Sequence, residues 1–316
     1  MSSHGRTVGI DVGGTKCLGI VLDEHGEVID EARRPTPRGD GSLPVLIDTL
    51  ADVAEALGPY DHVGIGVPGL VTRSGVLRAA PNLDGVADFD VAGLLGARLG
   101  HVVHVDNDAT CAAVAEWTYG AGAGSRDMVL VTLGTGIGGG LVLGGQLQRG
   151  ANGFTGEYGH MVVDPDGPPC PCGRRGCWER YASGSGLARL AREAAIGRRV
   201  SRVLDIAGGD PEAVRGEMVQ QAAREGDRDS LAVIDDFGRW VAIGLVSLTN
   251  ALDPERFVLG GGLAAGADLY LEPIRAWFER LIYQPELRPM PEIAFARWNE
   301  RAGAVGAALL HSVADA

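Results

Sequence analysis

The chain has 316 residues, of which 45% are hydrophobic, and its 41 acidic and 28 basic residues give a net charge of −13. This length favours two domains, and the acidic balance argues against nucleic acid as the main partner, because binding to phosphates needs a basic surface. The first six residues are polar and no apolar run reaches about 18 residues, so we expect no signal peptide, no membrane span and a cytoplasmic location.

The first pattern in the chain is an apolar run that ends in an acidic residue and a glycine turn, Thr7 to Lys16. A second apolar run follows directly, which predicts a β-meander and excludes a Walker A loop, since that loop opens a helix. Gly13 and Gly14 would let backbone N–H groups approach a phosphate, with Thr15 beside them. A plain hairpin turn explains the same residues, so both interpretations stay open.

Three more elements are expected before residue 100. Apolar spacing predicts a helix over residues 43–57 and a short helix over residues 91–99, with a buried strand at residues 63–67 between them. The glycines of residues 64–69 match the dinucleotide-binding pattern in form. Pro68 and the lack of a following helix argue against that function.

Polar residues stand where a strand at residues 101–106 meets a helix at residues 109–119. Asn107 and Asp108 occupy the junction, directly after Asp106. Asn or Asp at a helix start is usually a cap. The carboxyl end of a strand is also where ligand sites form in α/β sheets, so a cap and a ligand site are both open.

A second glycine-rich loop, residues 134–140, lies between two predicted strands. Because a strand follows it, the dinucleotide-binding interpretation fails here as well. Residues 8–27 and 130–147 share the order strand, Gly-Thr turn, strand, Gly turn. We interpret them as two copies of one β-unit that face a shared ligand.

Three of the five cysteines gather in one short segment. With one nearby histidine they form the Cys₃His set of a closed structural zinc site, namely His160, Cys170, Cys172 and Cys177. Disulfides or chance clustering are the alternatives, but an odd number of thiols and a reducing compartment favour metal. The metal would fix a loop over residues 157–179.

Most of the chain after residue 179 is predicted to be helical. Residues 180–280 have a helical pattern, and residues 241–252 are almost wholly apolar, which predicts a buried helix. A strand beginning at Phe257 ends in a run of three glycines. A strand near residues 293–296 and a final helix of small residues from Gly303 complete the chain.

The chain resembles the ROK family (repressors, open reading frames, kinases) over residues 7 to 312, in these motifs taken in order: Asp11-x-Gly-Gly-Thr15-Lys16, Asn107-Asp108, Gly134-Thr-Gly-x-Gly-Gly, Glu157-x-Gly-His160, Cys-x-Cys-Gly-x-x-Gly-Cys-x-Glu179 and Gly260-Gly-Gly. The resemblance implies an α/β, two-lobed hexokinase–actin-like fold (a duplicated ribonuclease H-like fold) with a structural zinc loop at residues 157–179. It also implies a small lobe of residues 1–106, against which the helix at about 302–316 packs, and a large lobe of residues 107–301.

The resemblance further implies ATP-dependent phosphorylation of a hexose, most like that of the glucokinases, which form glucose 6-phosphate. Asp108 would be the general base, and Asp11 would hold Mg²⁺ through water. The residues expected to bind the sugar are Gly69, Asn82, Asn107, Asp108, Glu157, His160 and Glu179, with His160 also on Zn²⁺. The residues expected to bind ATP are Gly13, Gly14, Thr15, Lys16, Thr135, Gly136, Gly260, Gly261 and Gly262, besides Asp11.

Other functions within the family remain open. A kinase for N-acetylmannosamine, N-acetylglucosamine, fructose or mannose has the same zinc segment, and polyphosphate could replace ATP. A non-catalytic sugar-sensing protein or a transcriptional regulator is disfavoured, because Asp108 and both phosphate loops are intact and only ten residues precede Asp11. We expect a homodimer or homotetramer, with the hexose and ATP as partners.

Overall fold

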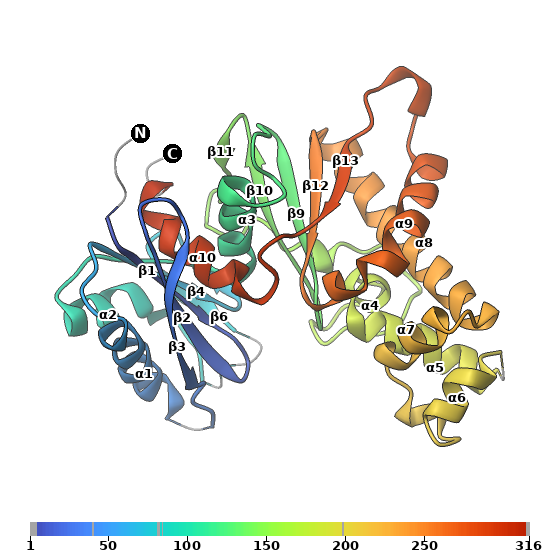
Figure 1. Ribbon diagram of the computed structural model, residues 1–316, viewed down its shortest axis with the longest axis horizontal. Coiled ribbons are helices and arrows are strands. Elements are labelled where there is room, and N and C mark those ends of the chain that lie inside the picture. The colour runs from blue at the N-terminus through green and yellow to red at the C-terminus, as the bar shows by residue number, and fades with distance from the viewer. Residues whose placement is uncertain (1–4, 40, 81–82, 84, 198, 314–316) are drawn as a thin grey trace. The chain divides into compact units, whose positions relative to one another are not determined.

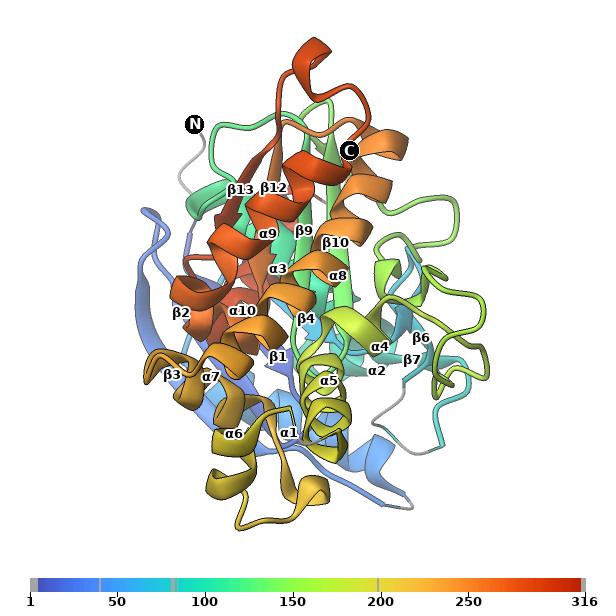
Figure 2. The same ribbon diagram turned by 90° about the vertical axis from the view of Figure 1, so that its right-hand side faces the viewer.

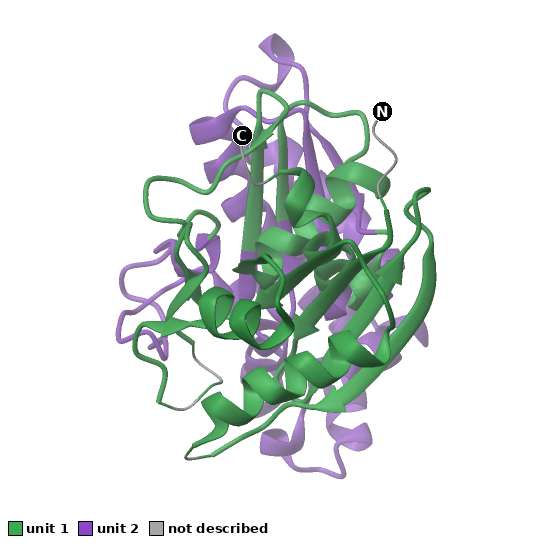
Figure 3. Ribbon diagram, turned by 90° about the vertical axis from the view of Figure 1, so that its left-hand side faces the viewer, with its two compact units in different colours: residues 1–130, 139–156, 297–316 green, residues 131–138, 157–296 purple. Residues whose placement is uncertain are grey.

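The computed structural model describes residues 5–39, 41–80, 83, 85–197 and 199–313. The chain forms two compact units, coloured separately in Figure 3. Unit 1 comprises residues 1–130, 139–156 and 297–316, and unit 2 comprises residues 131–138 and 157–296. Residues 107–130, 139–156 and 297–301, which were expected in the large lobe, therefore group with the N-terminal residues.

Unit 1 contains a five-stranded sheet in the order β3–β2–β1–β4–β8 (Figure 1). The first three strands form the predicted antiparallel meander, whereas β4 is parallel to β1 and β8 is parallel to β4. The strands are β1 (Thr7–Val12), β2 (Lys16–Leu22), β3 (Val28–Pro35), β4 (His62–Val67) and β8 (Val103–Asn107), with a small separate sheet of β5 (Leu70–Val71), β6 (Val76–Ala79) and β7 (Phe89–Asp90).

A second five-stranded sheet has the order β11–β10–β9–β12–β13. Numbered along the chain within each sheet, both have the order 3-2-1-4-5, with an antiparallel outer pair on one side and a parallel pair on the other. This shared order agrees with the internal repeat predicted from the two Gly-Thr turns. The strands are β9 (Met128–Leu133), β10 (Ile137–Leu143), β11 (Gln146–Leu147), β12 (Arg256–Gly260) and β13 (Glu292–Phe295).

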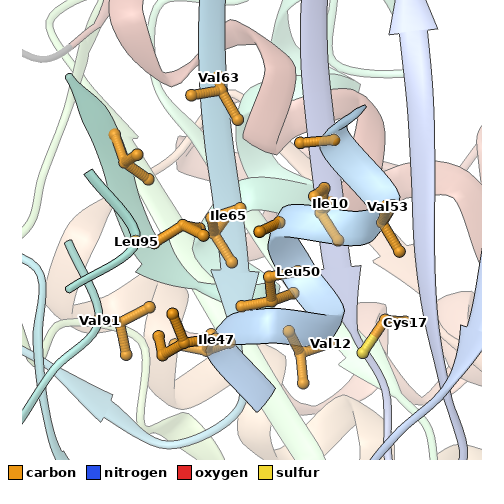
Figure 4. Close-up of a cluster of buried hydrophobic side chains, with 14 of the residues drawn as sticks. Ile10, Val12, Cys17, Ile47, Leu50, Val53, Val63, Ile65, Val91 and Leu95 are labelled. Atoms are coloured by element: carbon orange, nitrogen blue, oxygen red, sulfur yellow. The ribbon is translucent and has the colours of Figure 1, made fainter. Parts of the chain in front are cut away.

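The hydrophobic core of unit 1 lies on one face of its sheet, against α1 (Ser42–Ala56). Alternate residues of β1 point to this face, because successive side chains of a strand point to opposite faces. Figure 4 shows Ile10 and Val12 of β1 packed with Ile47 and Leu50 of α1. The helix α2 (Val91–Leu99), which the sequence predicted with the same bounds, adds two more buried side chains to this cluster.

The opposite face of the same sheet carries small and acidic residues and is covered by α3 (Asp108–Tyr119) and α10 (Ala302–Leu309) (Figure 1). A Cβ placed on Gly64 of β4 would lie 2.0 Å from the backbone oxygen of Ala307 in α10. The helix therefore packs directly on the backbone of the sheet, as the small-residue pattern at the end of the sequence suggested.

We expect Gly64→Ala to lower the free energy of unfolding by about 3 kcal/mol, the upper end of the usual cost of overpacking, because the added methyl group meets backbone that cannot rotate away. Urea unfolding of the purified chain measures this change. Gly197→Ala is a suitable control, since its Cβ would lie 3.3 Å from the nearest atom, a side-chain nitrogen of Arg199. The control should change stability by no more than about 0.5 kcal/mol; an equal effect of both changes would contradict the packing argument.

Unit 2 is mainly helical. Its long helices α8 (Arg228–Leu252) and α9 (Ala267–Leu281) cover one face of β12 and β13, as Figures 1 and 2 show. The predicted buried helix is the second half of α8, which begins 13 residues earlier because Asp227 caps it by accepting from the N–H of Ser230 at 2.8 Å. The other helices are α4 (Glu179–Ala182), α5 (Gly184–Ile196), α6 (Ser201–Ile206) and α7 (Gly216–Arg224).

Among the described residues, no helix is long and apolar enough to span a membrane.

Candidate active site

The junction between β8 and α3 holds Asn107 and Asp108. The Oδ1 atom of Asn107 accepts from the N–H groups of Ala109 (2.9 Å) and Thr110 (3.1 Å), so this residue caps the helix as the residue type suggests. The amide nitrogen of the same side chain donates to the backbone oxygen of Gly69 at 3.0 Å. Asn107 therefore fixes the start of α3 and the loop after β4 together.

Asp108 is half-buried at the first turn of α3. Its Oδ1 atom accepts from the N–H of Ala109 at 2.8 Å. A carboxylate at a helix N-terminus is stabilised by the helix dipole. The arrangement gives Asp108 a fixed position and leaves it the capacity to accept a proton.

Gly69 has a φ of +105°, and a Cβ there would lie 2.0 Å from the backbone oxygen of Ala79. Only glycine fits this conformation and this close approach. The carbonyl of Gly69 also accepts the hydrogen bond from Asn107. Gly69 therefore has a structural role in addition to the sugar contact expected from the sequence. Asn82, the neighbouring candidate, lies outside the described residues.

Asp11 of β1 lies on the sheet face that α3 covers, near Asp108 at the start of that helix. Gly66 of β4 separates them, since its Cβ would lie 3.6 Å from both the Oδ1 of Asp11 and the Cα of Asp108. Burial, followed by the charge of Asp108, raises the pKa of Asp11 to about 7, although Lys16 acts in the opposite direction. A buried carboxylate suits a hard divalent cation with oxygen ligands, so Asp11 fits Mg²⁺.

The turn after β1 is a tight hairpin, in which the N–H of Gly13 donates to the carbonyl of Lys16 at 2.9 Å. Gly14 and Thr15 are exposed, and no atom lies within 4 Å of a Cβ placed on Gly14. The side chain of Lys16 pairs with Glu300 at 2.7 Å, an exposed ion pair. The turn is therefore a hairpin that is open on the side to which a Cβ of Gly14 would point, while Thr36 and Arg38 donate to the carbonyls of Gly13 and Gly14.

The second glycine loop lies in unit 2 and lines a cavity of about 880 Å³. The N–H of Gly134 donates to Gly136 at 3.0 Å, and the carbonyl of Gly134 accepts from Gly184 at the start of α5 at 2.8 Å. Thr135 is exposed at the tip and lines the cavity together with Gly262. The loop after β9 and the glycine run after β12 thus meet at one cavity, as expected for a single nucleotide.

The predicted zinc ligands converge. The ligand atoms of His160, Cys170, Cys172 and Cys177 all lie within 4.8 Å of one another. The sulfurs of Cys172 and Cys177 are 3.6 Å apart, close to the edge of a tetrahedron of about 3.8 Å that follows from a Zn–S distance of about 2.3 Å. The donor set and its spacing fit zinc.

Two carboxylates flank His160, one at each ring nitrogen. The Nδ1 atom lies 3.8 Å from Glu179, whose Oε1 is also 3.0 Å from the sulfur of Cys170. The Nε2 atom lies 3.9 Å from Glu157. Nδ1 therefore faces the sulfur side of the cluster and Nε2 faces the second carboxylate.

Comparison with known proteins identifies the family. Residues 7–313 match the ROK family over almost the whole chain. The chain belongs to the ROK family.

Individual relatives include both glucose and amino-sugar kinases. The chain is 37% identical to the glucokinase of Streptomyces coelicolor over 307 residues, covering 96% of each protein. It is 36% identical to the N-acetylmannosamine kinase of Salmonella arizonae, over 96% of this chain and 97% of that protein. Among solved structures, the ROK family glucokinase from Streptomyces griseus in complex with glucose and AMPPNP has a TM-score of 0.84 and 36% identity, covering 97% of this chain and 99% of that one.

In this ROK chain the segment of residues 157–179, which carries the Cys/His cluster, is anchored to the helices of unit 2 through Trp178. The indole is fully buried, and its Nε1 donates to the backbone oxygen of Trp240 in α8 at 2.8 Å. Its own N–H donates to the carbonyl of Met161, next to His160, at 2.8 Å. The sequence shows a Trp beside Cys177 and Glu179 but not the helix that it contacts.

The cavity of unit 2 is lined by a group of basic residues that the sequence pattern does not assign to a site. Four arginines line it, from the start of α4, from α5 and from the segment before α7: Arg180, Arg189, Arg192 and Arg215. Arg189 stacks over the ring of Tyr181 at 4.8 Å, and Arg192 donates from Nε to the carbonyl of Val214 at 3.1 Å. Arginines spaced along an amphipathic helix usually face solvent, so their spacing does not indicate that these face a cavity.

Proposed function

We propose that this ROK chain is an ATP-dependent hexose kinase that converts glucose to glucose 6-phosphate. The observation that carries the proposal is the placement of Asp108, fixed at the start of α3 and close to the buried carboxylate of Asp11. Phosphoryl transfer needs a positioned acceptor for the hydroxyl proton and a charged group for the metal, and this pair supplies both. The likeness to the Streptomyces griseus glucokinase supports ATP and glucose as the substrates.

Asp108 would take the proton from the 6-hydroxyl of the sugar while that oxygen forms a bond to the γ-phosphorus of ATP. The bond between this phosphorus and the bridging oxygen breaks, and ADP leaves with the electron pair. Asp11 would hold Mg²⁺ through water, and the ion would neutralise charge on the phosphates.

The phosphate chain of ATP would be held by backbone N–H groups and by cations. The family motifs point to the hairpin turn at Gly13, Gly14, Thr15 and Lys16 and to the loop at Thr135 and Gly136, with Gly260, Gly261 and Gly262 on the nucleotide side. The four arginines of the cavity add positive charge beside Thr135 and Gly262. This charge would attract a nucleotide although the chain as a whole is acidic.

The sugar hydroxyls would be bound by Gly69, Asn82, Asn107, Asp108, Glu157, His160 and Glu179. Zn²⁺ would be held by His160, Cys170, Cys172 and Cys177 and would fix the loop rather than take part in the transfer. Since Nδ1 of His160 faces the sulfurs, Nε2 is the nitrogen left to bind sugar. The zinc ion would thereby orient one of the sugar-binding side chains.

A kinase for N-acetylmannosamine is the second candidate, because the relative from Salmonella arizonae is as similar in sequence as the solved glucokinase. Sugar sensing without catalysis is a third. We further propose that the protein is cytoplasmic and forms a homodimer or homotetramer.

ADP release by the purified protein with MgATP tests the proposal, sugar by sugar, with glucose, mannose, fructose, N-acetylglucosamine and N-acetylmannosamine. We expect the highest kcat/KM with glucose. A higher value with an N-acetyl sugar would keep the mechanism and replace the substrate. Turnover with none of the five, in protein that contains zinc, would contradict the kinase proposal.

A further inference from the structure

Glu116 is a fully buried carboxylate that the proposed chemistry does not use. It lies in the second half of α3, eight residues after Asp108. A buried charge is costly unless it is hydrogen-bonded, so its partners indicate what it stabilises. Within the described residues, its partners are backbone N–H groups from two distant parts of unit 1.

The carboxylate of Glu116 accepts three backbone hydrogen bonds. Its Oε1 accepts from the N–H of Trp298 at 2.7 Å, and its Oε2 accepts from Arg297 at 3.0 Å and from Ala121 at 2.8 Å. The guanidinium of Arg297 also donates to the carbonyl of Tyr119 at 3.1 Å, beside the same turn. Glu116 thus connects the end of α3 to Arg297 and Trp298, where the last segment of unit 1 begins.

The segment that begins at Arg297 leads directly to the proposed metal and phosphate groups. Glu300 pairs with Lys16 at 2.7 Å. Gly303, in the first turn of α10, approaches Asp11 so closely that a Cβ there would lie 2.5 Å from its Oδ1. Fixing residues 297 and 298 therefore fixes the segment that bounds the side chains of Asp11 and Lys16.

We propose that Glu116 is a positioning residue for the metal–nucleotide end of the site: it holds residues 297–303 against Asp11 and Lys16 and so sets the affinity for the magnesium nucleotide. The inference rests on the proposed kinase function. Glu116 does not touch the substrate in this account, and its effect reaches the site through backbone alone. The binding of sugar, which we assign to other residues, should depend on it little.

Glu116→Gln tests the inference, because the amide keeps the size of the side chain but turns an NH₂ group toward N–H donors. We expect the Kd for MgADP, measured by calorimetry, to rise about tenfold and the KM for MgATP to rise with it. The Kd for glucose should stay within twofold. A role in stability alone would lower Tm and leave both affinities of the folded protein unchanged, which would overturn the inference.

Two further variants keep the test decisive if Glu116→Gln folds poorly. Gly303→Ala introduces a methyl group beside the carboxylate of Asp11, and it should weaken MgADP binding while Glu116 is intact. Ser125→Ala removes a buried hydroxyl whose Oγ donates to Gly122 at 2.6 Å, a hydrogen bond within the turn after α3. This control should lower Tm and leave the Kd for MgADP unchanged. Wild-type MgADP affinity in Gly303→Ala, or a Ser125→Ala effect equal to that of Glu116→Gln, would overturn the inference.

Failure of the inference is distinguishable from failure of the proposed function. If the wild-type protein binds MgADP but phosphorylates none of the sugars, the kinase proposal is wrong. The Kd values for MgADP of the wild type and of Glu116→Gln still test the role of Glu116 in that case. If the wild type turns over and Glu116→Gln binds MgADP normally, the kinase proposal stands and the inference is wrong.

Discussion

Asp108→Asn should lower kcat with glucose by about 10²–10⁴-fold, the usual contribution of a general base. The amide has the same shape, and its oxygen can still accept from the N–H of Ala109, so the start of α3 should be preserved. What is lost is the capacity to take a proton. Glucose binding, measured by calorimetry, should therefore remain within about tenfold of the wild type.

Asp106→Asn is the matched control, because it makes the same chemical change two residues earlier. Asp106 is 4% exposed and pairs at 2.7 Å with Arg149, whose side chain is 12% exposed, so neutralising Asp106 should weaken this largely buried ion pair. We expect this control to lower Tm, since breaking a buried ion pair is strongly destabilising. Normal turnover in Asp108→Asn would contradict the assignment of the base.

Cys172→Ser should remove zinc and activity together. A serine hydroxyl is a poor substitute for a thiolate on zinc, and three remaining ligands hold the ion more weakly. Cys172 is the exposed one of the three cysteines in the cluster, so the substitution creates no buried cavity. Metal content per chain, measured by elemental analysis, and kcat/KM with glucose should fall in parallel.

Arg174→Ala is the control for this change, because it alters an exposed side chain in the same turn and leaves all four ligands in place. It should retain zinc and activity. Full activity of Cys172→Ser after its zinc has been lost would show that the metal does not orient His160 for the sugar.

The elements of the fold were predictable wherever local pattern decides them. The helix at residues 91–99, the opening meander and the small-residue helix that begins beside Gly303 follow from periodicity and glycine placement. The convergence of the zinc ligands was predictable because Cys and His at short spacing have few other uses.

The rest of the site depends on contacts between residues far apart in the sequence. Glu116 looks like an ordinary helix residue until the N–H groups of Arg297 and Trp298, 181 and 182 positions away, are seen to bind it. The arginines of the cavity could not be predicted for the same reason. A helical pattern shows which face of a helix is polar, but not whether that face meets solvent or a cavity.

The shared strand order of the two sheets also bears on how the protein arose. In the first strand of each sheet the fifth residue is Asp11 in one copy and Thr132 in the other, and each is followed by a glycine turn. In the second copy the threonine hydroxyl accepts from the N–H of Gly138 at 3.0 Å, so it serves its own loop. An ancestral duplication would have produced two equal halves, and divergence at this one position leaves a negative charge in only one of them. Under the proposed function, the carboxylate that holds the metal is therefore present in one copy of the β-unit and absent from the equivalent position of the other.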